Sequence, residues 1–249
     1  TAGWRHTGRA KAARKCKQIE SSMRLVIFDC DGTLIDSQHA IYGSMSQAFG
    51  ALGLPAPSRT DVLGIVGLSL PEALAVLAPR ESEAVRRELI DAYRNGFVGV
   101  RARPDHQEAL YDGISATVAA LASRPDIVLG IATGKSKRGV ARLLAQEGWE
   151  DHFLTIQTAD DHPSKPHPSM LLQAMAETGA APHEAIMIGD TTYDMEMALN
   201  AGVGAIGVSW GYHASERLRG AGAHAIVEKG LHLLDAIELQ LAAQQEAAS

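Results

Sequence analysis

Two aspartates follow the first strongly apolar segment of the chain. Asp29 and Asp31, in the motif Asp-Cys-Asp-Gly-Thr, come directly after the apolar residues 25–28. Such a run, ended by acids and glycine, is typical of a central strand that passes into a loop, and open α/β sheets bind ligands beyond the carboxyl ends of their strands. A solvated acidic turn would also explain these residues, because Asp and Gly are ordinary turn formers.

Two later apolar runs also end in polar residues, the first at Thr133 and Gly134 and the second at Asp190 and Asp194. Between them, Lys165 lies on a proline-containing loop. The carboxyl ends of parallel strands share one edge of a sheet, so we expect these side chains to converge on the first two aspartates. Taken singly, each residue has a simpler explanation. The two acids are favourable at the start of a helix, Thr133 is an ordinary residue at the end of a strand, and Lys165 is an ordinary charge on a solvated loop.

In this order, the motifs Asp-x-Asp-Gly-Thr, strand-end Thr, Lys-Pro and Gly-Asp-x-x-x-Asp resemble those of the haloacid dehalogenase-like hydrolases. Each motif is common by itself, whereas the ordered set with its strand contexts is specific. The resemblance extends from about residue 25 to the last predicted helix. It implies phosphoryl transfer, which needs an in-line nucleophile and neutralisation of the phosphate charge.

The resemblance and the chemistry assign the same roles. We expect Asp29 to attack phosphorus and form an aspartyl-phosphate, and Asp31 to protonate the leaving alcohol and later activate water. The transferring oxygens would contact Thr133, Gly134 and Lys165. The oxygen ligands expected for Mg²⁺ are Asp29, the backbone carbonyl of Asp31, Asp190 and, through water, Asp194.

Three other patterns carry no chemistry in this interpretation. Residues 130–136 resemble a P-loop but have three residues between the glycines where that motif has four, which excludes an NTPase. His162 and His167 lack the helical spacing of a zinc pair, so we expect structural or solvated roles. Cys30, between two carboxylates, is expected to be a small buried residue without reactivity.

Charge is distributed unevenly along the 249 residues. Residues 1–24 contain seven Lys and Arg against one Glu, a net charge of +6, and since the whole chain carries −6 the remainder carries −12. We expect residues 1–22 to be a basic disordered extension, with no apolar core of a secretory signal, and Met23 to be the natural start. The acidic body argues against nucleic-acid binding, and no apolar run reaches membrane-spanning length. Two cysteines predict no disulfide framework and favour a reducing cytoplasm.

The alternation of helical and strand patterns predicts an α/β fold with a doubly wound, Rossmann-like parallel sheet. Residues 23–36 and 108–249 would form this core. Between them, two amphipathic helical patterns predict an all-helical insertion over residues 37–107, where the family carries its cap domain. One pattern includes Met45 and Phe49, and the other includes Leu89 and Phe97.

The predicted function is a Mg²⁺-dependent phosphatase, monomeric or homodimeric, that hydrolyses a small phosphorylated metabolite resembling phosphoglycolate. Leu70 stands where related sugar phosphomutases tend to carry a phosphate-binding Arg, and no aromatic cluster offers a platform for a base. Arg59 is the candidate cation for a second anionic group, although a solvated surface position would also suit it. Sugar phosphomutase and inorganic pyrophosphatase remain alternatives within the fold. A non-catalytic phospho-Asp receiver or binding module is the alternative from another class, disfavoured by chain length and motif order.

Overall fold

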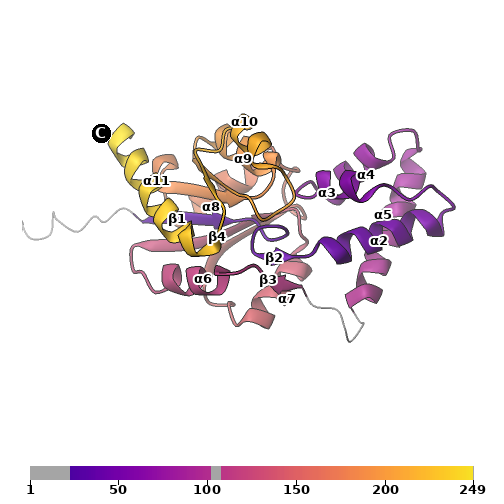
Figure 1. The fold of residues 1–249 in the computed structure, drawn as a ribbon, viewed down its shortest axis with the longest axis horizontal. Coiled ribbons are helices and arrows are strands. Elements are labelled where there is room, and N and C mark those ends of the chain that lie inside the picture. Colours follow the sequence, from indigo (N-terminus) through magenta and orange to yellow (C-terminus); the bar gives the residue numbers. More distant parts are fainter. Residues whose placement is uncertain (1–22, 102–107, 249) are drawn as a thin grey trace, which may run out of the picture.

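The computed structural model describes residues 23–101 and 108–248. The expected basic extension, residues 1–22, and residues 102–107 of the expected insertion lie outside the described residues. Elsewhere the predicted fold class is confirmed: a doubly wound parallel sheet with flanking helices is accompanied by a separate helical segment (Figure 1). No helix in the described part of the chain is both long enough and apolar enough to cross a membrane.

Six parallel strands form the sheet in the order β5-β4-β1-β6-β7-β8. Their bounds are β1 (Arg24–Phe28), β4 (Ile127–Thr133), β5 (Phe153–Thr158), β6 (Ala185–Gly189), β7 (Gly204–Val208) and β8 (Ala225–Val227). β1 pairs with β4 on one side and with β6 on the other. The strand order therefore reverses at β1, and such a switch point is where open α/β sheets bind ligands.

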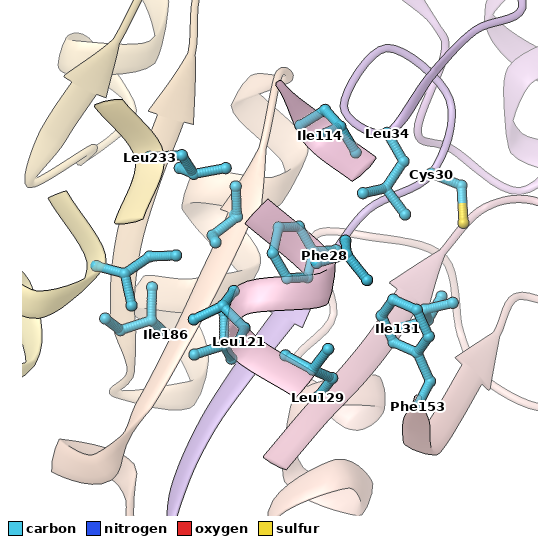
Figure 2. Close-up of a cluster of buried hydrophobic side chains, with 14 of the residues drawn as sticks. Phe28, Cys30, Leu34, Ile114, Leu121, Leu129, Ile131, Phe153, Ile186 and Leu233 are labelled. Carbon is cyan, nitrogen blue, oxygen red and sulfur yellow. The ribbon is translucent and has the colours of Figure 1, made fainter. Parts of the chain in front are cut away.

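Helices cover both faces of the sheet. One face carries α6 (Ile114–Ala122), α7 (Lys137–Glu147) and α11 (Leu233–Ala248), and the other carries α8 (Ser169–Thr178), α9 (Thr192–Ala201) and α10 (Ser215–Gly220). Along β1, Val26 and Phe28 join the first of these apolar layers, which Figure 2 shows around Phe28, whereas Leu25 and Ile27 join the second. Burial on both faces explains the uninterrupted apolar run of this strand.

Four helices between the first and second core strands lie to one side of the sheet (Figure 1). They are α2 (Gln38–Ala51), α3 (Arg59–Gly64), α4 (Leu70–Leu77) and α5 (Glu83–Arg101). Their apolar faces form a core of their own, in which Met45, Leu74 and Leu89 are at most 1% exposed. A short antiparallel pair, β2 (Ile35–Asp36) with β3 (Ala109–Leu110), joins this segment to the sheet. Two-residue strands have no alternation pattern, so the sequence did not predict them. Two short 3₁₀ helices, η1 (Pro182–Glu184) and η2 (Gly230–His232), complete the described elements.

Candidate active site

The strand ends bring four of the predicted residues into one buried cluster. Asp29 follows β1, Asp190 follows β6 and Asp194 lies in the first turn of α9, and one carboxylate oxygen from each lies within 4.8 Å of the others. Lys165, from the loop between β5 and α8, places Nζ 2.5 Å from Asp194 Oδ1 and 3.1 Å from Asp29 Oδ1. None of the four residues is more than 1% exposed.

Burial dominates the electrostatics of this cluster. It raises the pKa of Asp29 to about 6, against the opposing effect of the Lys165 ammonium. Burial and then the Asp194 and Asp29 charges raise the pKa of Asp190 well above its ordinary value. For Lys165, burial lowers the pKa, but the Asp194 and Asp29 carboxylates more than offset this and keep the amine protonated. The cluster thus holds three carboxyl groups and one ammonium, an arrangement that favours binding of a further cation.

The donor set fits Mg²⁺. Asp29 Oδ2 is buried and has no hydrogen-bond partner among the residues that the structure describes. A buried carboxylate oxygen without a partner is uncommon, because leaving it unsatisfied is costly. One carboxylate oxygen each from Asp29, Asp190 and Asp194 forms an all-oxygen group, which suits a hard divalent cation.

Two glycines allow the backbone to approach Asp190 closely. Gly32 has φ +90°, and a Cβ added there would lie 2.2 Å from Asp190 Oδ2. A Cβ at Gly211 would lie 2.2 Å from Asp190 Cβ. The carboxylate accepts hydrogen bonds from Thr33 Oγ1 at 2.9 Å and from the Tyr212 backbone N–H at 2.8 Å. Gly32 and Thr33, which follow the first two aspartates, therefore position a third aspartate that comes directly after β6.

Asp194 combines two roles. Its Oδ2 accepts hydrogen bonds from the backbone N–H of Thr191 at 3.1 Å and from Thr191 Oγ1 at 2.7 Å, which closes a capping box at the start of α9. The explanation as a helix-start acid is therefore correct for this residue. Its other oxygen nevertheless belongs to the buried cluster through Lys165.

Asp31 lies apart from that cluster and contacts a residue that the sequence analysis did not select. Its Oδ1 accepts hydrogen bonds from Lys135 Nζ and from Ser37 Oγ, both at 2.6 Å. The stem of Lys135 crosses Gly139 of α7, where an added Cβ would lie 2.8 Å from Lys135 Cγ. Its ammonium also lies 6.0 Å from the centre of the Phe97 ring. The sequence signal for this lysine is its place in Thr-Gly-Lys at the end of a strand.

The carboxyl end of β4 contacts the helical segment directly. Thr133 is buried and accepts a hydrogen bond from the Lys135 backbone N–H at 3.2 Å. A Cβ added to Gly134 would lie 2.8 Å from the carbonyl oxygens of both Gly67 and Leu68. Glycine at this position therefore lets the loop between α3 and α4 pack against the sheet edge.

A cavity of about 620 Å³ lies between the sheet edge and the helical segment. Asp29, Asp31 and residues 133–135 line its core side, whereas Lys165, Asp190 and Asp194 are not among its lining residues. Arg59 does not line it either. The guanidinium of Arg59 donates to Gln38 Oε1 at 2.7 Å and lies 5.6 Å from the centre of the Tyr42 ring, so it is not the expected cation for the substrate.

Neither the histidine nor the cysteine near the site has a place in this chemistry. His162 bridges Ser169 Oγ and Gln157 Oε1, each at 2.8 Å, and so fixes the two ends of the loop that carries Lys165. Burial raises the pKa of Cys30, and the two flanking aspartates add to this effect. The thiol therefore stays protonated and unreactive.

Comparison with known proteins gives a consistent family. A model described as "Haloacid dehalogenase-like hydrolase" matches residues 26–208. The chain is 36% identical to a probable phosphatase IndB of Dickeya dadantii over 82% of this chain and 89% of that protein. It is 34% identical to a tyrosine-protein kinase PtkA of Mycobacterium tuberculosis, over 80% and 66% of the two chains. A phosphoglycolate phosphatase of Photorhabdus laumondii is 28% identical over 92% and 99%.

A solved structure agrees with these relatives. A predicted phosphatase from Clostridium acetobutylicum superposes with a TM-score of 0.76 at 28% identity, over 87% of this chain and 98% of that one. The similarity therefore includes the helical segment as well as the sheet.

Proposed function

This chain belongs to the haloacid dehalogenase-like hydrolases and is a phosphatase, and on that premise we propose that it hydrolyses a small phosphomonoester through an aspartyl-phosphate on Asp29, with Mg²⁺ as cofactor. One observation carries the proposal. Asp29 lies at the switch point of the sheet and lines the cavity. One of its carboxylate oxygens contacts the Lys165 ammonium, and the other has no hydrogen-bond partner in the described part of the chain. A carboxylate so placed can bind a cation and face a phosphate.

Two carboxylates would carry out different steps of the reaction, one as the nucleophile and the other as the general acid and base. Asp29 would attack phosphorus, with Lys165 holding its carboxylate in place. Asp31, anchored by Lys135 and Ser37, would give its proton to the leaving alcohol and then accept a proton from the attacking water. The hydroxyl of Thr133 and the backbone N–H of Gly134 would donate to the transferring oxygens.

Asp29, Asp190, Asp194 and the carbonyl of Asp31 would hold the cation. Mg²⁺ supplies neutralisation of the phosphate charge when it is bound. Lys165 contributes to the same end by offsetting part of the negative charge of the carboxylates.

We further propose that residues 37–107 act as a cap over a catalytic core of residues 23–36 and 108–249. The cap would exclude water from the aspartyl-phosphate until hydrolysis. Its contacts with the core support this: the Tyr193 hydroxyl donates to the Gly64 carbonyl at 3.1 Å, and Ser69 N–H donates to Ser164 Oγ at 2.8 Å.

The experiment is release of inorganic phosphate from phosphoglycolate, pyrophosphate, glucose phosphates and nucleoside monophosphates, with the wild type and Asp29→Asn. We expect Mg²⁺-dependent release, fastest with short organic phosphoesters, and no turnover by the variant. Preference for pyrophosphate would favour the pyrophosphatase, and isomerisation of a sugar phosphate would favour the mutase. Stable phosphorylation without turnover would favour a receiver. Turnover by Asp29→Asn within about tenfold of wild type, a difference of about 1.4 kcal/mol, would disprove the nucleophile.

A further inference from the structure

The cavity is larger than the reaction needs. The reacting phosphate would occupy the end formed by Asp29, Asp31 and residues 133–135, yet the whole space measures about 620 Å³. Cavities of about 300–1,000 Å³ typically enclose organic molecules of drug size. Space for a substantial organic group therefore remains beyond the phosphate.

The cap side of this space is mainly apolar. Its lining comes from α2, the loop between α3 and α4, the start of α4, and α5, and includes Ile41, Met45, Leu68, Leu70, Phe97 and Val98. Tyr93 and Phe97, one turn apart on α5, place their ring centres 5.5 Å apart. The sequence places both residues on one apolar helical face but does not indicate that this pair lines a cavity. Such a wall favours an apolar, and especially an aromatic, substrate body.

Three arginines line the same cavity: Arg138 and Arg142 on α7, and Arg94 on α5. Among the residues that the structure describes, none forms an ion pair with any of the three. By contrast, Lys137, the neighbour of Arg138, is paired with Asp161 at 2.5 Å.

The placement of the α7 arginines opposes the stability of that helix. Arg138 and Arg142 are four residues apart, and like charges at this spacing destabilise a helix. Arg138 also lies in the first turn, where the helix dipole disfavours a cation and where α7 has no acidic residue. A bound anion between the two guanidinium groups would relieve both effects.

We propose that the substrate is a phosphomonoester with an apolar body and a second anionic group, which Arg138 and Arg142 bind with help from Arg94. The inference rests on the proposed function, since it assumes that the phosphate lies at Asp29. A carboxylate or a phosphate would each suit a guanidinium pair. Phosphoglycolate has the second anion but lacks the body, so it would fill only part of the cavity.

Four primary alkyl phosphates separate the two requirements: ethyl phosphate, phosphoglycolate, benzyl phosphate and 4-carboxybenzyl phosphate. We expect the highest kcat/KM for 4-carboxybenzyl phosphate, about tenfold above benzyl phosphate, which corresponds to about 1.4 kcal/mol. We also expect benzyl phosphate to exceed ethyl phosphate. The bisphosphate of 1,4-benzenedimethanol replaces the carboxylate by a phosphomethyl group. After its kcat/KM is halved for its two equivalent esters, the larger ratio to benzyl phosphate identifies the preferred anion.

The arginines are tested by the ratio of kcat/KM for 4-carboxybenzyl phosphate to that for benzyl phosphate, in which any general loss of activity cancels. Arg138→Gln/Arg142→Gln should bring the ratio close to one, and Arg142→Glu should bring it below one. The control Arg80→Gln/Arg219→Gln removes two positive charges outside the cavity lining and should leave the ratio unchanged.

Equal hydrolysis of the two benzyl esters by the wild type, or an unchanged ratio in the α7 double variant, would overturn this inference alone. Hydrolysis of none of the esters would overturn the proposed function together with the inference. The two failures are therefore distinguishable.

Discussion

Replacing the proposed nucleophile should make the metal-free protein more stable. Asp29→Asn removes one negative charge from a fully buried group of three carboxylates and one ammonium, and it preserves the size of the side chain. Burial is the largest cause of the raised pKa of Asp29. The wild-type fold therefore bears an energetic cost for holding this carboxylate ionised, and the amide avoids that cost.

The size of the expected stability gain follows from the shift in the pKa of Asp29. A rise from the ordinary 3.8 to about 6 corresponds to about 3 kcal/mol at neutral pH. Loss of one partner of Lys165 offsets part of the gain, although that ammonium keeps Asp194 at 2.5 Å. We expect a net increase of about 1–2 kcal/mol in the free energy of unfolding, and so a rise of about 3–6 °C in Tm for a chain of this size.

The pH dependence has a defined sign. Because the pKa of Asp29 is higher in the folded than in the unfolded chain, the folded protein binds more protons between pH 4 and 6. The stability of the wild type attributable to this group therefore falls as pH rises through that window and stays low above it. The increase in the free energy of unfolding caused by Asp29→Asn should therefore be largest at pH 8 and should become smaller towards pH 4.5.

The assay is thermal unfolding, followed by circular dichroism in EDTA at pH 8, 6.5, 5 and 4.5. Asp126→Asn is the control, because hydrogen bonds from Arg124, and then from Arg24, lower the pKa of Asp126 despite the effect of its partial burial. That carboxylate stabilises the fold above its unfolded pKa, so its loss should lower Tm throughout pH 5–8. A Tm of Asp29→Asn at or below wild type at pH 8, or an advantage independent of pH, would refute the reasoning.

Three further predictions address the site. Asp31→Asn should lower kcat by about 10²–10⁴-fold, since it removes a general acid and base, and rapid-quench trapping should show an accumulated phosphoenzyme if hydrolysis becomes limiting. Mg²⁺ should raise both the activity and the Tm, and EDTA should abolish the activity. Ca²⁺ should inhibit, because its larger coordination shell disturbs the in-line geometry of the reaction. Full activity after chelation would contradict the metal site. Gly32→Ala should displace Asp190 and reduce activity at least about tenfold, while the circular dichroism spectrum stays unchanged. The control is Gly53→Ala, which should leave activity unchanged. Gly53 also has a positive φ, but an added Cβ there would have no atom within 4 Å.

The sequence determined the sheet and the order of its functional residues. Buried parallel strands need apolar runs, and the residue that follows each run must emerge at the carboxyl edge. Asp29, Thr133 and Asp190 could therefore be assigned to one edge from the printed chain. The helical faces around Met45 and Leu89 were equally predictable, because their period is local.

The tertiary structure decided which side chains meet and what surrounds them. Lys135 and Asp31 are 104 residues apart, and no local pattern specifies their 2.6 Å contact. Arg59 looked available for the substrate but is held by Gln38 within the helical segment. Arg138 and Arg142 lie on an exposed helix face, and only the fold shows that this face lines the cavity. Periodicity encodes the elements because it depends on neighbouring residues, whereas the cavity depends on how distant elements pack, which no short stretch of sequence specifies.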